Sequence, residues 1–426
     1  MTHSVSGGVS TPARGKLAVL MPGMGAVATT FMAGVEAIRL GMAAPVGSVS
    51  QQAVMEMADG TVGIGAVLGL AKLEELEFGG WDIYEGTTFD AARAARVLSP
   101  EHLEAVRPAL EAVTPMKAVF DRRFVRNLEG PNVKGDGEKR RLVEALRADI
   151  RRFMDTRGCD RAVAIWCGST ETYVAPSPVH ADLGALEKGL DEDDEYISPS
   201  MMYAYACLKE GVPYANGAPN LTLDCGALVE LAEREGVAVA GKDLKTGQTL
   251  LKTIVAPGLA SRHLGVNGWY STNILGNRDG AVLDDPQSFK TKEESKLSVL
   301  GSILDAEQHP DLYDDLTHQV RIDYYPPRGD NKEGWDNIDI FGWMGYPMQI
   351  KVNFLCRDSI LAAPLVLDLA LFLDAAQRAG KSGVQDWLSF FFKCPQACDG
   401  EVPVHDLFEQ RRRLYDGVMQ LASALD

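Results

Sequence analysis

One short stretch near the start of the chain restricts its fold more than any other feature. Residues 16–22 form an apolar run of strand length and lead directly into Gly-Met-Gly-Ala-Val-Ala at residues 23–28. This is the spacing G-x-G-x-x-A, at which a strand turns sharply into a helix whose N-terminus can hold a pyrophosphate. The pattern predicts a dinucleotide site. Its candidate cofactor-binding residues are Gly23, Gly25, Ala26 and Val27.

A second helix start, far along the chain, has the composition of another phosphate site. Residues 242–249 read Lys-Asp-Leu-Lys-Thr-Gly-Gln-Thr. Thr246, Gly247, Gln248 and Thr249 can offer successive backbone N–H groups and two hydroxyls to an anion. A plain threonine N-cap fits the same residues about equally well. A dinucleotide site together with a separate phosphate site indicates redox chemistry on a phosphorylated substrate.

Composition excludes several classes of protein. The 426 residues are 46% hydrophobic, enough for two to three domains or for one large domain with an insertion. The net charge of −17 argues against nucleic acid or an anionic membrane as a partner. Seven scattered cysteines without a C-x-x-C pair favour reduced thiols in the cytoplasm, and they predict no metal site.

Two further features bear on membranes. The N-terminus is polar and has no apolar signal core. The longest apolar stretch, residues 360–376, is interrupted by one proline and two aspartates. We therefore expect a buried helix there rather than a membrane span.

Strand and helix patterns alternate over the first 240 residues. Strands are expected at residues 16–22, 77–84, 161–167, 213–216 and 237–240, and helices up to about residue 40, at 100–113 and at 139–157. The alternation predicts a mostly parallel sheet with helices on both faces. Period-2 alternation at residues 319–325 and 348–354 then predicts an antiparallel sheet with one solvent-exposed face, followed by long helices.

Polar residues follow two of the expected strands. Asp82, near the end of the second strand, is a candidate acceptor for ribose hydroxyls, but it lies well beyond the usual gap of about 20 residues from the glycines. Either an insertion intervenes or Asp82 is a loop carboxylate, and composition slightly favours the loop. Ser169 and Thr170, after the next strand, either bind the cofactor or form a helix N-cap box with Glu171, and the residues alone favour the N-cap.

Lysines supply the remaining candidates. Lys292 and Lys296 are four residues apart and would share a helix face, where paired ammonium groups can hold phosphate or stabilise an enolate oxygen. A solvated helix with interleaved glutamates is the simpler interpretation. Lys332 lies in a turn, and Lys393 follows a bulky apolar run. The pKa of such a lysine can be lowered so that it acts as a base, although lysines more often extend to solvent.

The order of these segments resembles the inositol-3-phosphate synthase family from about residue 16 to residue 395. The resemblance is most specific in the following segments: 242–249, 275–280, 289–296, 329–332 and 357–364, with a final lysine motif at 388–395. It implies an α/β fold in which a Rossmann-like NAD-binding domain, residues 1–245 and 365–426, carries an inserted α+β catalytic and tetramerisation domain, residues 246–364. It also implies a homotetramer in the cytoplasm.

The family's reaction, as the resemblance implies it, needs no net oxidant. Enzyme-bound NAD oxidises C5 of glucose 6-phosphate, which acidifies C6, and the resulting enolate attacks the C1 aldehyde. NADH then reduces C5 again, giving 1L-myo-inositol 1-phosphate. The resemblance leaves open whether a divalent or monovalent cation assists.

The resemblance also implies roles for single residues. Lys292 and Lys393 would move protons at C5 and steady its oxygen. Lys296 and Lys332 would contact the phosphate and the oxyanions. The remaining implied site residues are the carboxylates Asp243, Asp279 and Asp358, which would fix lysines and substrate hydroxyls, and Asp330 and Ser359 among the cofactor contacts.

Departures from the family pattern cluster near the cofactor. The segment that is often Thr-Ala-Asn-Thr-Glu is Cys-Gly-Ser-Thr-Glu at residues 167–171, and the usual Asn-Asn-Asp-Gly is Asn-Arg-Asp-Gly at residues 277–280. They leave two alternatives: a related NAD-dependent carbocyclase for another sugar phosphate, such as a ketose 6-phosphate, or an inactive sugar-phosphate-binding homologue. All the lysines carried over from the family are present, which argues against the inactive homologue.

Overall fold

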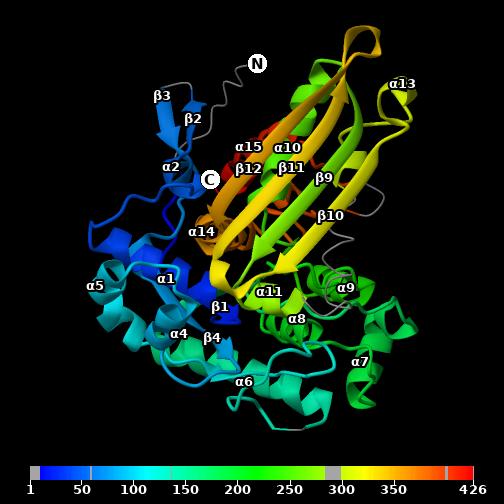
Figure 1. Ribbon diagram of the computed structural model, residues 1–426. Helices are drawn as coiled ribbons and strands as arrows, with labels where there is room; N and C mark the ends of the chain where they lie inside the picture. Colours follow the sequence, from blue (N-terminus) through cyan, green and yellow to red (C-terminus); the bar gives the residue numbers. More distant parts are fainter. Residues whose placement is uncertain (1–9, 58–59, 136, 284–298, 399–401, 426) are drawn as a thin grey trace.

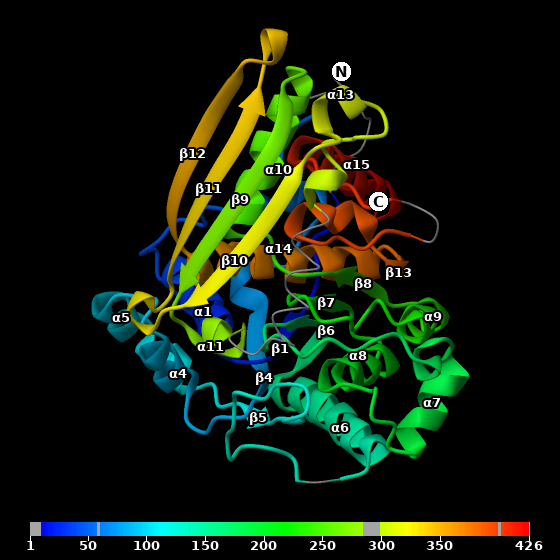
Figure 2. The same cartoon turned by 45° about the vertical axis from the view of Figure 1, so that its right-hand side comes forward.

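Two large β-sheets, joined by helices, organise the molecule (Figures 1 and 2). The computed structural model describes residues 10–57, 60–135, 137–283, 299–398 and 402–425. One sheet has seven strands and the other has four among these residues. A small two-stranded hairpin stands apart from both.

The seven-stranded sheet is parallel throughout. Its strands, in spatial order, are β13 (Gly383–Val384), β8 (Ala238–Gly241), β7 (Tyr214–Asn216), β6 (Cys159–Trp166), β1 (Lys16–Pro22), β4 (Leu76–Asp82) and β5 (Met116–Lys117). The first strand of the chain is thus central, with β4 on one side and β6 on the other. This reversal of strand order is the switch point at which doubly wound α/β proteins bind ligands. The predicted fold class is confirmed.

Side chains of β1 alternate between two hydrophobic cores. Leu17, Val19 and Met21 face one core, whereas Ala18 and Leu20 face the other. Because helices cover both faces, the strand is apolar on both sides, which explains the continuous apolar run in the sequence.

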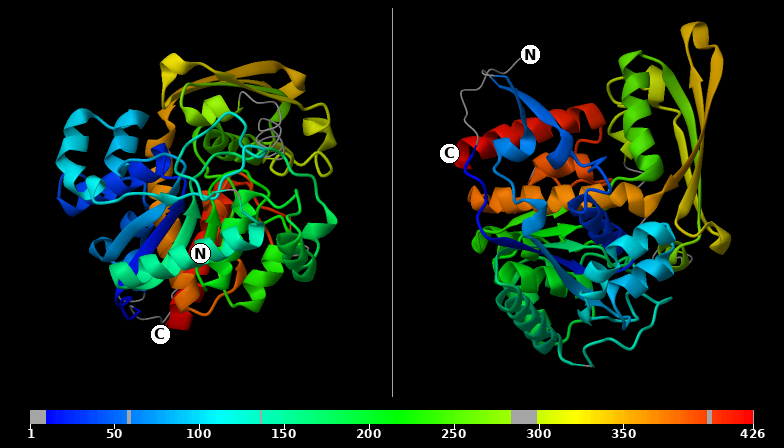
Figure 3. Two further views of the ribbon diagram at one scale, coloured as in Figure 1. Left: turned by 90° about the horizontal axis from the view of Figure 1, so that it is seen from below. Right: turned by 90° about the vertical axis from the view of Figure 1, so that its left-hand side faces the viewer.

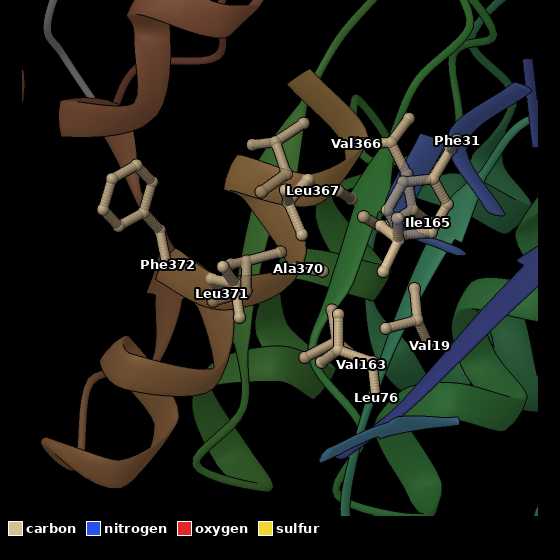
Figure 4. Packing of buried hydrophobic residues seen from close by; sticks show 14 of the residues in the cluster. Val19, Phe31, Leu76, Val163, Ile165, Val366, Leu367, Ala370, Leu371 and Phe372 are labelled. Atoms are coloured by element: carbon tan, nitrogen blue, oxygen red, sulfur yellow. The ribbon is translucent and has the colours of Figure 1, made fainter. Parts of the chain in front are cut away.

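Helices cover each face of this sheet. One face packs against α1 (Ala26–Arg39), α4 (Thr88–Ala95), α5 (Pro100–Glu111), α14 (Asp358–Arg378) and α15 (Leu407–Leu425). The other packs against α6 (Lys139–Arg157), α7 (Leu183–Asp191), α8 (Pro199–Lys209) and α9 (Gly226–Arg234), with the short helix η2 (Pro178–His180) between α6 and α7. Figure 4 shows the first core, where Val366 of α14 approaches Phe31 of α1 and Ile165 of β6, whereas Phe372 lies at the other end of the labelled part of α14.

Helix α14 is long and apolar enough to cross a membrane by length and composition alone. However, 72% of its most apolar 18-residue window is buried inside the protein. The predicted buried helix at residues 360–376 is therefore confirmed.

The four-stranded sheet departs from the prediction in one respect. Its spatial order is β10 (Thr317–Tyr324), β9 (Gly265–Leu275), β11 (Asn331–Phe341) and β12 (Pro347–Arg357). β11 is antiparallel to both of its neighbours, but β10 runs parallel to β9, so the expectation of a wholly antiparallel sheet is wrong. The long connection between β9 and β10, which includes α11 (Arg278–Leu283) and α13 (Pro310–Tyr313), lets the chain return in the same direction.

Helix α10 (Gly247–Ser261) lies against one face of this sheet, as the right-hand view of Figure 3 shows. Ala256 of the helix and Trp269, Ile338 and Ile340 of the sheet form the shared core. The opposite face carries large exposed apolar side chains. These are Tyr270, Trp335 and Leu355. Short 3₁₀ helices, η3 (Pro326–Arg328) and η4 (Trp343–Gly345), join the strands.

An insertion separates α1 from β4. It comprises α2 (Val49–Gln52), β2 (Val54–Met57), β3 (Gly60–Gly63), α3 (Ile64–Val67) and η1 (Leu73–Glu75). Asp368 of α14 fastens it, accepting hydrogen bonds from Ser48 Oγ at 2.5 Å, Val49 N at 2.7 Å and Ser50 N at 3.0 Å. Burial raises the pKa of Asp368 to about 6.

Candidate active site

A cavity of about 520 Å³ opens at the switch point of the seven-stranded sheet. Several turns that follow parallel strands line it, including those after β1, β4 and β6. Site residues predicted from the sequence that line this cavity are Gly23, Gly25, Ala26, Val27, Asp82, Ser169, Thr170, Asp243, Thr246, Asp279, Asp358, Ser359 and Lys393. Residues from both halves of the chain therefore meet at one place.

The glycine turn leaves the N-terminus of α1 open. Gly23 has φ +88°, and a Cβ there would lie 2.2 Å from the Cα of Gly168, so the position requires glycine. Gly25 is the N-cap of α1 and provides no side-chain cap, and a Cβ built on it would meet nothing within 4 Å. The free N–H groups of the first helical turn thus face open space, which fits the pyrophosphate of a dinucleotide.

Asp82 ends β4 next to this turn. Its carboxylate accepts hydrogen bonds from Met24 N at 2.7 Å and from Tyr84 N at 3.0 Å. Burial raises its pKa above the usual value, although the backbone N–H groups act against this shift. The insertion between α1 and β4 accounts for its distance from the glycines, so the interpretation of Asp82 as a loop carboxylate is wrong.

The segment after β6 corrects a second expectation. Residues 167–176 form no helix, so the N-cap interpretation of Ser169 and Thr170 is wrong. Glu171 instead accepts hydrogen bonds from Ser200 N at 2.8 Å and Ser200 Oγ at 2.6 Å, and burial raises its pKa to about 7. Glu171 thereby ties this cavity-lining loop to the start of α8, a role that no local sequence pattern indicated.

Lys393 and Asp243 form a buried ion pair at 3.0 Å between Nζ and Oδ1. Their side chains are 5% and 3% exposed, so the interpretation that Lys393 extends to solvent is wrong. The backbone brings them together: the segment after η5 (Asp386–Phe391) returns to the end of β8, where Lys393 N donates to Asp243 O at 2.6 Å.

A second ion pair, between a buried lysine and a half-buried aspartate, lies close to the start of α10. Lys332 Nζ contacts Asp358 Oδ2 at 3.1 Å, and Thr246 Oγ1 donates to Asp358 Oδ1 at 2.7 Å. Burial would raise the pKa of Asp358, but Lys332, Lys393 and the Thr246 hydroxyl outweigh it and hold that pKa well below its usual range. Burial likewise opposes the charge of Lys332, yet Asp358 and Asp279 raise the pKa of Lys332 above its usual value. Both groups are charged at neutral pH.

A third polar group joins the first turn of α14 to the turn before β11. Ser359 Oγ donates to Asp330 Oδ1 at 2.8 Å, and Asn277 Nδ2 donates to the same oxygen at 3.2 Å. Burial raises the pKa of Asp330. Asp330 therefore holds Ser359, which lines the cavity, instead of lining the cavity itself.

Only part of the predicted phosphate cradle lines the cavity. Thr246 lines the cavity, and Lys332 passes beside Gly247, where a Cβ would lie 3.9 Å from Lys332 Cε. Gln248 and Thr249 are buried without lining the cavity, and the Gln248 amide faces the four-stranded sheet. Lys292 and Lys296 lie outside the described residues.

The parallel sheet of β1, β4 and β6, with its switch-point cavity, defines a Rossmann-like dinucleotide-binding protein of the α/β class. A family model described as myo-inositol-1-phosphate synthase, of an NAD-binding type, matches residues 17–418. The chain belongs to this family and is an NAD-dependent enzyme of that type.

Individual relatives agree with this assignment. The chain is 54% identical over 404 residues to inositol-3-phosphate synthase 1 of Bacteroides thetaiotaomicron, covering 94% of each chain. It is 34% identical to the probable inositol 3-phosphate synthase isozyme 3 of Arabidopsis thaliana, covering 82% of this chain and 71% of that relative. The crystal structure of inositol-3-phosphate synthase from Caenorhabditis elegans has a TM-score of 0.91 at 28% identity and covers 97% of this chain and 87% of that chain.

Proposed function

We propose that this protein converts D-glucose 6-phosphate into 1L-myo-inositol 1-phosphate, with NAD as a cofactor that is regenerated within each turnover. The observation that carries the proposal is the convergence of a dinucleotide turn and two lysine–carboxylate ion pairs around one cavity. The relatives' names support the same substrate class. The glycine turn, Asp82 and the loop at Ser169 and Thr170 would hold the cofactor.

When bound, NAD supplies the chemistry of accepting a hydride from C5 and returning it. The C5 hydroxyl loses a proton together with that hydride and becomes a ketone, which makes the C6 protons acidic. Removal of one C6 proton gives an enolate, a C6–C1 bond forms, and the C1 oxygen gains a proton. The C5 oxygen regains a proton when the hydride returns, so the sequence is redox-neutral.

Lys393 is positioned to exchange the proton of the C5 hydroxyl, because it lines the cavity and is fixed by Asp243. Lys332, beside the start of α10, would bind the phosphate or an oxyanion, with Asp358 orienting it. By resemblance, Lys292 would share the proton transfer at C5 and Lys296 the phosphate contact. The backbone at Thr246, Gly247, Gln248 and Thr249 would complete the phosphate cradle.

We further propose the division into an NAD-binding domain, residues 1–245 and 365–426, and an inserted catalytic domain, residues 246–364. The pairing of β13 with β8 supports it, because the chain returns to the first sheet after the insertion. The exposed side chains of Tyr270, Trp335 and Leu355 on one face of the four-stranded sheet support pairing of subunits into a homotetramer. The scattered cysteines, which include no C-x-x-C pair, support a cytoplasmic location. Light scattering at micromolar concentration should give about four times the 46.1 kDa chain mass, and a monomer mass would contradict the tetramer.

The test of the function is a substrate panel. The protein is incubated with NAD and a series of hexose phosphates, and products are identified by NMR. We expect 1L-myo-inositol 1-phosphate from glucose 6-phosphate only. Cyclisation of a ketose 6-phosphate instead would favour the related carbocyclase, and binding without turnover would favour the inactive homologue. Consumption of NAD in proportion to product would contradict the redox-neutral scheme.

A further inference from the structure

The face of α10 that meets the four-stranded sheet is polar where a hydrophobic contact is expected. Gln248 lies in the first turn of the helix and is 5% exposed. Its Nε2 lies 3.1 Å from Thr272 O, 3.0 Å from Trp335 O and 2.9 Å from Asp336 Oδ2. The amide is thus anchored on two adjacent strands, β9 and β11, and faces away from the cavity-lining Thr246.

Asp336 is the centre of this buried group. It is 4% exposed and accepts hydrogen bonds from Trp269 Nε1 at 2.8 Å and Ser271 Oγ at 2.6 Å, in addition to Gln248. One turn further along α10, Lys252 Nζ lies 2.7 Å from His318 Nε2 and is also buried. A satisfied buried polar network fixes the relative position of two elements more narrowly than apolar packing does.

The backbone of β11 is shaped for the same contact. A Cβ on Gly334 would lie 2.7 Å from Gln248 Cγ, so glycine at this position makes room for the glutamine side chain. The space and the hydrogen bonds therefore point to one fixed placement of the first turn of α10.

We propose that Asp336 and Gln248 are positioning residues for phosphate recognition: their hydrogen bond holds the first turn of α10 against the sheet, so that the helix N-terminus stays at Thr246, which lines the cavity. This inference rests on the proposed function, because it assumes that the start of α10 receives the substrate phosphate. Gln248 then acts through its side chain as an anchor and through its backbone as part of the cradle. Asp336 never touches the substrate.

The test uses the full-length, NAD-loaded protein. Calorimetry measures the Kd of inorganic phosphate and of glucose 6-phosphate, and steady-state kinetics separates KM from kcat. Gln248→Met keeps the side-chain length but removes the amide, and Asp336→Asn keeps the side-chain shape but removes the charge. Gly334→Ala displaces the Gln248 side chain without removing any polar group. The matched control is Asp339→Asn, on the same strand, whose carboxylate faces the other side and accepts from Gln349 Nε2 at 2.8 Å.

We expect the Kd of both ligands and the KM to rise about tenfold in Gln248→Met and Asp336→Asn, as for a lost buried hydrogen bond, with kcat within about threefold. The Gln248→Met/Asp336→Asn double variant should bind no more weakly than the weaker-binding single variant, because each substitution removes the same hydrogen bond between Gln248 Nε2 and Asp336 Oδ2. The Asp339→Asn control should bind like the wild type. Should Asp336→Asn fail to fold, Ser271→Ala removes a single hydrogen bond from the same carboxylate and is expected to weaken binding about threefold.

Two outcomes separate the anchor from the function it serves. Lower thermal stability with unchanged Kd and KM in the folded variants would overturn the positioning role and leave the proposed function intact. A wild-type protein that binds neither inorganic phosphate nor glucose 6-phosphate would contradict the proposed function itself.

Discussion

Replacing Lys393 by methionine separates the structural role of this lysine from its chemical role. The substitution keeps most of the apolar stem but removes the ammonium that faces Asp243 at 3.0 Å. Because the Asp243 side chain is only 3% exposed, the change leaves a carboxylate buried beside an apolar group. The variant should therefore lose both stability and turnover.

The size of each loss follows from the geometry. Removing one partner of a buried ion pair costs about 3–5 kcal/mol. Asp243 has interactions besides those with Lys393, so we expect the lower end, about 3 kcal/mol. Loss of a positioned general acid–base group should lower kcat at least about 10²-fold.

A double variant distinguishes the two effects. Lys393→Met/Asp243→Asn also removes the unpaired charge, so most of the lost stability should return while turnover stays low. Urea unfolding followed by tryptophan fluorescence gives the free energy of unfolding, and product NMR gives the rate. Recovery of turnover together with stability in the double variant would refute proton transfer by Lys393 and leave it a structural partner of Asp243.

Three further predictions address other parts of the molecule. Lys292→Met should lower kcat at least about 10²-fold, with a smaller effect on the binding of glucose 6-phosphate. Lys296→Met should mainly weaken that binding. Near-normal turnover in Lys292→Met would favour the interpretation of these lysines as the exposed face of a solvated helix. Gly25→Val should fold normally but raise the Kd of NAD at least about tenfold, measured by calorimetry, because its side chain would occupy open space at the start of α1; unchanged affinity would argue against pyrophosphate binding there. Burial raises the pKa of Asp368 from its usual 3.8 to about 6, so the folded protein binds this proton more tightly than the unfolded chain and loses about 3 kcal/mol of stability as pH rises from about 4 to about 6. Asp368→Asn should abolish that part of the pH dependence in urea titrations, and an unchanged slope would contradict it.

Local sequence patterns predicted correctly those helices and strands whose formation depends on neighbouring residues. The strand at residues 16–22 and the helix at 139–157 were predicted with the observed bounds, because apolar periodicity and helix ends depend on neighbouring residues. The helix expected at 100–113 is also present, and it begins at the N-cap Ser99, whose hydroxyl accepts a hydrogen bond from His102 N. Thirteen of the site residues predicted from the sequence line the cavity.

Predictions failed where distant segments decide the outcome. The role of Asp82 depended on an insertion that adds strands before β4, and the direction of β10 depended on the connection that precedes it. The direction of the Gln248 side chain depends on Asp336, 88 residues later in the sequence. Burial of Lys393 depends on the return of its segment to β8. No local pattern contains these contacts.

The pairing of Asp243 with Lys393 also has a consequence during synthesis on the ribosome. The two residues are 150 positions apart, and β13, which extends the same sheet edge, is made just before Lys393. At about 5–20 residues per second, about 8–30 s separate their appearance in the nascent chain. Over that interval the cofactor turn can already fold, but the ion pair between Asp243 and Lys393 cannot yet form. The enzyme therefore acquires its chemistry only after Lys393 has been made, and chains that terminate before this residue are expected to be both inactive and destabilised at this sheet edge.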